Sequence, residues 1–154
     1  MKKIVMLSVF CFAMLAQGCA SVTTQSSTID KVVTIDGTKK NALYVKANNW
    51  MVQSFNSAKS VVQFTDKESG TISGRYLLGT VSAASEYGPA RHVYAGIKIQ
   101  VKDGASKITI NPESFVYSKG NPYTLYTEEN VERDVNALLV SFEKAMKNTD
   151  DSDW

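Results

Sequence analysis

The segment VYAGIKIQV (residues 93–101) alternates apolar side chains with small or polar ones along its whole length. Its odd-numbered residues are all apolar, whereas Tyr94, Lys98 and Gln100 stand between them. Successive side chains of a β-strand point to opposite faces of the sheet. The pattern therefore predicts a strand with one buried face and one face open to solvent.

Four further strands are predicted around this segment from runs of apolar and β-branched residues that end at glycine-containing turns. Three of the turns follow or precede a strand directly and contain Asp36-Gly37, Ser69-Gly70 and Asp103-Gly104. The predicted strands lie at residues 29–35, 61–65, 71–80 and around 108–110.

Two segments carry the spacing of three and four residues that is typical of amphipathic helices. One runs from Leu43 to Phe55 and has Thr38 as its expected cap. The other runs from Val131 to Met146, and Thr127 with Asn130 is expected to cap it. Each has one apolar stripe, so both helices are expected to cover the same face of the sheet.

The predicted fold is thus α+β, with a single antiparallel sheet of about five strands and two helices on one face, in the order β-α-β-β-β-β-α. The folded domain is assigned to residues 29–147, and residues 148–154 are assigned to an acidic tail. The sheet face opposite the helices is left open.

The start of the chain has the organisation of a bacterial export signal. Lys2 and Lys3 precede the apolar run Ile4–Leu15, which is too short for a transmembrane helix of about 20 residues. Ala16 and Gly18 supply the small residues that ordinary signal cleavage requires. Simple secretion is therefore one interpretation of this segment.

Cys19 favours a second interpretation, because small residues followed by a cysteine resemble the lipobox of bacterial lipoproteins. The lipobox usually has Leu three residues before the cysteine, where this chain has Ala16. The resemblance implies a signal peptide over residues 1–18, cleavage between Gly18 and Cys19, and lipidation of Cys19. Residues 19–28 would then be the lipidated cysteine and a flexible tether.

The residue after the cysteine indicates in which membrane a lipoprotein is expected to reside. In lipoproteins an Asp at that place implies retention in the inner membrane, and this chain has Ala20. The expected location is the outer membrane, facing the periplasm. Without Lys2 and Lys3, the 17 basic side chains become 15 and equal the 15 acidic ones, so no nucleic-acid partner is expected.

The first predicted helix and the hairpin after it contain an ordered run of residues: Trp50, then Phe55-Asn56-Ser57-Ala58-Lys59, the strand Val61–Thr65, and Lys67-Glu68-Ser69-Gly70-Thr71-Ile72. In this run the chain resembles a family of exported bacterial proteins described as a domain of unknown function with a TBP-like fold. The resemblance covers about residues 30 to 115, and the family has no assigned activity to carry over.

No catalytic or metal motif stands out, so no cofactor, no metal and no enzyme activity are expected. His92 is the only histidine, and a small envelope hydrolase built around it is the alternative function. The acidic residues Glu128, Glu129 and Glu132 are read as favourable charges at a helix start rather than as a catalytic pair.

The open face of the sheet is the candidate ligand surface, for an anionic polymer or an envelope protein. The alternative is an ordinary solvated sheet face. The function expected is that of a membrane-anchored lipoprotein with a small binding or structural module. The candidate residues are Arg75, Tyr94, Lys98, Gln100, Lys102, Lys107 and Thr109.

Overall fold

The computed structural model describes residues 20–25, 27–55 and 61–148. Seven strands and two helices are defined within these ranges. In chain order they are β1 (Ser21–Thr23), β2 (Ile29–Thr34), α2 (Lys40–Ser54), β3 (Val62–Asp66), β4 (Thr71–Ser82), β5 (Arg91–Lys102), β6 (Ala105–Pro112), β7 (Val116–Ser118) and α4 (Glu128–Lys147).

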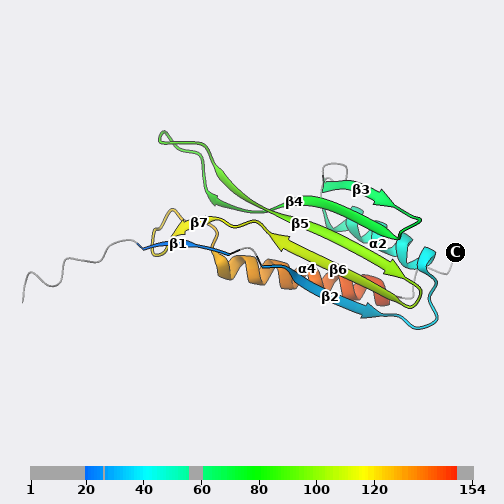
Figure 1. Ribbon diagram of the computed structural model, residues 1–154. Helices are drawn as coiled ribbons and strands as arrows, with labels where there is room; N and C mark the ends of the chain where they lie inside the picture. Colours follow the sequence, from blue (N-terminus) through cyan, green and yellow to red (C-terminus); the bar gives the residue numbers. More distant parts are fainter. Residues whose placement is uncertain (1–19, 26, 56–60, 149–154) are drawn as a thin grey trace, which may run out of the picture.

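Five of the strands form one antiparallel sheet in the order β2-β6-β5-β4-β3. Both helices lie on the same face of this sheet (Figure 1). The predicted α+β architecture is therefore confirmed, and the structure places the strand that contains residues 93–101 at the centre of the sheet. None of the helices in the described ranges has the length and apolarity needed to span a bilayer.

The core lies between the sheet and the helices and uses the alternation seen in the sequence. Ile97 and Ile99 of β5 and Ile108 of β6 are fully or almost fully buried, with exposed fractions of at most 2%. Phe142 of α4 is completely buried and meets the ring of Trp50 on α2 edge to face, with centroids 5.2 Å apart. These contacts join the two helices to each other as well as to the sheet.

The start of α2 differs from the prediction. Its N-cap residue is Lys39 rather than Thr38, and Lys39 makes no side-chain capping bond. The carboxylate of Asp103, in the turn between β5 and β6, accepts a hydrogen bond from the backbone N–H of Lys40 (2.7 Å). A side chain from a distant turn thus satisfies a donor that the sequence pattern assigned to a local cap.

The predicted tether is wrong for residues 21–24. Ser21–Thr23 form β1, which pairs antiparallel with β7 in a separate two-stranded ribbon. Thr24 continues this contact, because its N–H donates to the carbonyl of Phe115 (2.9 Å). The predicted signal peptide, Cys19, residues 56–59 of the family resemblance and the tail after Asn148 lie outside the described residues.

Glu143 on α4 joins the helix to the edge strand β2. Its carboxylate forms ion pairs with Lys31 of β2 and, one helical turn away, with Lys147 (2.6 Å). Hydrogen bonds from Lys147 and Lys31 lower the pKa of Glu143 from 4.5 to about 2. The carboxylate is therefore held in its charged form over the neutral range.

We expect Glu143→Gln to lower stability at neutral pH and to flatten the acid end of the stability profile. Because the folded pKa is depressed, the stabilisation is present above about 4.5 and is lost as pH falls through about 2. The check is urea unfolding at a series of pH values, with Glu132→Gln on the exposed side of the same helix as the control. An unchanged pH profile in Glu143→Gln would contradict the role given to these ion pairs.

Candidate functional site

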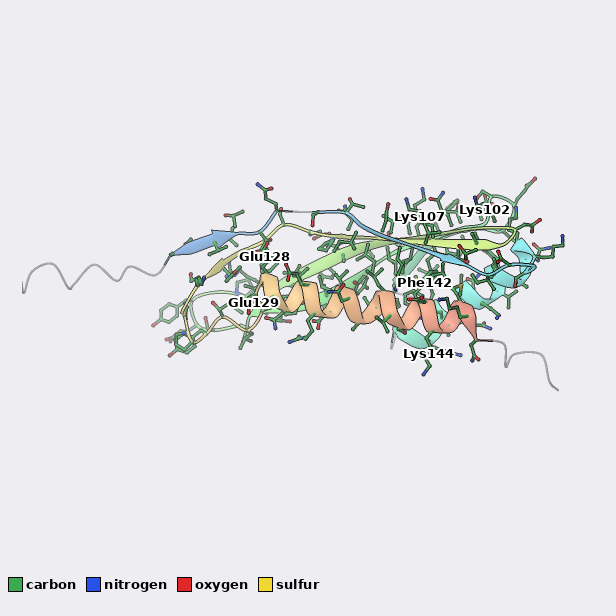
Figure 2. All side chains as sticks on the ribbon, turned by 90° about the horizontal axis from the view of Figure 1, so that it is seen from below. Lys102, Lys107, Glu128, Glu129, Phe142 and Lys144 are labelled. Carbon is green, nitrogen blue, oxygen red and sulfur yellow. The ribbon has the colours of Figure 1, made fainter. Side chains whose placement is uncertain are left out.

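All seven candidate residues lie on the sheet face that the helices leave uncovered, which we call the open face. The strand register places them there: Lys98 is opposite Thr109, and Gln100 is opposite Lys107. Arg75, whose placement is less direct from the sequence, is opposite Gly96 on the same face. Figure 2 shows Lys102 and Lys107 on the side of the sheet away from α4, and Lys144 on the far side of that helix.

Arg75 is held within the open face by two partners. Its Nε and one terminal nitrogen donate to the two carboxylate oxygens of Glu113 (2.7 and 3.0 Å), and its guanidinium lies 3.8 Å from the ring centroid of Tyr94. The hydrogen bonds to Glu113 raise the pKa of Arg75. Arg75 and Tyr94 are thus engaged with the protein itself.

Lys107 is neutralised in a similar way. Its ammonium group lies 2.6 Å from a carboxylate oxygen of Asp30 on the neighbouring strand β2. Hydrogen bonds from Lys107 and from Thr109 lower the pKa of Asp30. Two of the candidate residues therefore serve to hold an acidic side chain at the edge of the sheet.

Lys98 and Lys102 differ from these side chains because neither forms an ion pair with any carboxylate in the described parts of the chain. Both are exposed, and exposed Gln100 lies between them on β5. Residues two apart on a strand are about 7 Å apart on one face, so the three form a short polar row. We call Lys98, Gln100 and Lys102 the lysine row.

A shallow hollow of about 360 Å³ lies at one end of the lysine row. It sits over the turn between β5 and β6 and has an exposed aliphatic wall from Val32, which is 62% exposed. The hollow combines two ammonium groups, an amide and apolar walls. Its lining residues are Val32, Ser69, Gln100, Val101, Lys102, Ala105, Ser106 and Lys107.

A second polar group lies on the helix side of the sheet. The hydroxyl of Tyr126 donates to the carboxylate of Asp134 (2.9 Å), and Arg133 pairs with the other oxygen (2.8 Å). Burial raises the pKa values of Tyr76 and Tyr126, so both phenols stay protonated at neutral pH. This group ties the loop before α4 to the helix and opens to no cavity described above.

His92 lies at the start of β5 and is exposed. Its Nδ1 is 3.0 Å from the hydroxyl of Thr80, and its ring stands edge to face with Tyr94 at 6.4 Å. The described residues place no carboxylate in hydrogen-bonding contact with this ring, and they contain no cluster of three or more metal-ligating side chains. Among the described residues, the hydrogen-bond partner of this ring is the hydroxyl of Thr80.

Sequence reasoning missed the acidic partners Asp30 and Glu113. Asp30 lies on β2 and Glu113 directly follows β6, so each reaches its lysine or arginine only through the pairing of the strands, and Arg75 and Glu113 are 38 residues apart. It also missed the exposed apolar members of the open face, Phe64 (53% exposed) and Leu77 (52% exposed). Because successive residues of the strand predicted at 71–80 point to opposite faces, the assignment of Arg75 to the open face would also have placed Leu77 there.

Comparisons with known proteins agree with this architecture. A family model described as a domain of unknown function (DUF4468) with TBP-like fold matches residues 30–117. A DUF4468 family protein from Bacteroides ovatus is similar with 15% identity and a TM-score of 0.55, over 92% of this chain and 98% of the other.

A TBP-like protein from Parabacteroides distasonis is similar with 14% identity and a TM-score of 0.56, over 80% of this chain and 94% of the other. At these identities the likeness concerns the fold. A comparison with curated proteins found no match.

Proposed function

Because this chain belongs to the DUF4468 family of domains of unknown function with a TBP-like fold, whose fold carries no activity with it, we propose its function from its own signal and surface. We propose that it is an outer-membrane lipoprotein that is anchored through Cys19 and faces the periplasm. Its domain serves as a binding module for an anionic polymer of the cell envelope. Catalysis is not part of the proposal.

The observation that carries the ligand proposal is the unequal pairing of the cations on the open face. Asp30 and Glu113 neutralise Lys107 and Arg75, whereas the lysine row is left without carboxylate partners in the described residues. The unpaired ammonium group of Lys102 lines the hollow of about 360 Å³, and that of Lys98 lies farther along β5, so the two offer a place for phosphate, sulfate or carboxylate groups. Gln100 adds an amide donor between the two charges.

We expect Lys98→Ala/Lys102→Ala to weaken binding of a polyanion about tenfold, since two exposed charge contacts contribute up to about 1 kcal/mol each. The probe is dextran sulfate titrated against the full protein, with neutral dextran as the reference. The matched control is Lys119→Ala/Lys144→Ala, which removes the same charge from exposed lysines away from the lysine row.

Equal loss of affinity in the two double variants would contradict the assignment, because it would mean that net charge alone drives binding. Absence of any dextran sulfate binding at low salt would overturn the polyanion class and would leave an envelope protein as the partner to seek.

A further inference from the structure

Exposed apolar side chains gather at one end of the domain, away from the lysine row. Tyr87 at the tip of the β4–β5 hairpin is 91% exposed, and Tyr123 and Leu125 in the loop before α4 are 80% and 58% exposed. Large apolar side chains at this level of exposure in one region are a common mark of an interaction surface. We call these three residues the aromatic end.

The aromatic end has a defined shape. The turn that presents Tyr87 is closed by two backbone hydrogen bonds between Ser85 and Gly88 (2.9 and 3.2 Å). The backbone N–H of Leu125 donates to the carbonyl of Val81 on β4 (2.9 Å), which fixes the loop beside the hairpin.

Between hairpin and loop lies a groove of about 820 Å³, and among the described residues that line it Arg91 is the one charged side chain. Its lining residues are Ser82, Ala83, Ala84, Ser85, Tyr87, Gly88, Pro89, Arg91, Pro122, Tyr123 and Leu125.

The described chain begins at this same end. The carbonyl of Ala20 accepts a hydrogen bond from the N–H of Lys119 (3.0 Å), and β1 is paired with β7 directly before the loop that carries Tyr123. Figure 1 shows β1, β7 and the hairpin tip at one end of the molecule. Cys19 is one residue before Ala20, and one residue spans at most about 3.6 Å. A lipid on Cys19 would therefore leave the domain almost no slack.

We propose that the aromatic end rests in the interface of the membrane that holds the lipid, with Tyr87, Tyr123 and Leu125 at the level of the headgroups. This proposal rests on the lipid anchor put forward under the proposed function. Tyrosine is favoured at this depth because its ring is apolar and its hydroxyl can stay hydrated. Charges of both signs occur near this end, because Arg91 and Lys119 are basic and Glu86 is acidic. We therefore attribute the membrane contact to the apolar side chains.

The orientation has a consequence for the ligand surface. β5 runs from Arg91 beside the aromatic end to Lys102 beside the hollow, a span of roughly 35 Å at about 3.3 Å per residue. The sheet would stand away from the membrane, and the lysine row would project into the periplasm. A ligand would reach it without competition from lipid headgroups.

The test places a tryptophan at each site in the full lipidated protein bound to vesicles of phosphatidylethanolamine and phosphatidylglycerol. Tyr87→Trp and Tyr123→Trp are compared with Val32→Trp, which lies on the open face and is 62% exposed in the parent. We expect brominated acyl chains to quench roughly half of the added fluorescence at positions 87 and 123 and none at position 32. The added fluorescence is the difference from the parent protein, which contains Trp50 and Trp154.

The possible outcomes distinguish a failure of the proposed membrane contact from a failure of the proposed lipid anchor. If the protein floats with the vesicles but positions 87 and 123 behave like position 32, the membrane contact is wrong and the anchor stands. If the protein does not float, the anchor fails and this inference fails with it. A concentration-dependent blue shift at positions 87 and 123 without vesicles would assign the surface to a second copy of the chain and overturn the proposal.

Discussion

Replacing Cys19 with alanine should release the protein from the membrane into the soluble fraction of the envelope. Each buried methylene of an acyl chain contributes about 0.8 kcal/mol, and a single chain binds a membrane only marginally. A lipoprotein cysteine carries several chains, so loss of the thiol removes the whole attachment at once. Ala16 and Gly18 still satisfy ordinary signal cleavage, so export of the variant should continue.

The measurement is membrane fractionation with mass determination of the recovered protein. The parent should sediment with the outer membrane and carry the mass of a lipidated chain beginning at Cys19. Cys11→Ala is the matched control, because the second cysteine of the chain lies inside the predicted signal and should have no effect on location. Sedimentation of Cys19→Ala with the outer membrane, or recovery of the parent with the inner membrane, would contradict the anchor as proposed.

The sequence predicted those parts of the fold whose pattern is local. Residues 93–101 alternate over a full strand, and the two helices repeat their apolar residues over several turns, so each pattern is long enough to identify its element. The β1–β7 ribbon has no such pattern. Ser21–Thr23 is short and polar, and its partner Val116–Ser118 is more than ninety residues away in the chain.

The candidate site likewise combines features that a local sequence pattern predicts with features that depend on contacts between distant segments. Alternation placed Lys98, Gln100 and Lys102 on one face of one strand, which needs no knowledge of the other strands. Which cations are neutralised depends on the register between strands, as for Lys107 with Asp30 and for Arg75 with Glu113. The aromatic end is built from a hairpin tip and a loop that are joined by the bond from Leu125 to Val81. Composition alone could not bring these segments together.

In the proposals above, the aromatic end contacts the membrane and the lysine row binds the ligand, and the long central strands join these two regions. β4 and β5 are each 12 residues long and run from one region to the other. The core beneath them is what keeps the two regions at a fixed separation. Damage to that core should therefore affect both regions together.

We expect Phe142→Ala to cost about 3–5 kcal/mol of unfolding free energy, because it removes a large, completely buried side chain from the contact between the two helices. Natural domains have only about 5–15 kcal/mol in total, so the variant should be close to unfolding at 25 °C. Trp50 would lose its edge-to-face contact with Phe142 at 5.2 Å and would keep the one with Phe55 at 6.0 Å and the hydrogen bond from its indole N–H to Ser141 (3.0 Å).

Urea unfolding of the soluble Cys19→Ala form, followed by circular dichroism and tryptophan fluorescence, measures the Phe142→Ala effect. Val140→Ala is the control on the same helix: Val140 is 63% exposed, and its truncation should change stability by no more than about 0.5 kcal/mol. A loss below about 1 kcal/mol in Phe142→Ala would mean that α4 does not form the core as described. In that case the fixed separation between the aromatic end and the lysine row would lose its physical basis, since α4 packs on β2, β4 and β6 and on α2.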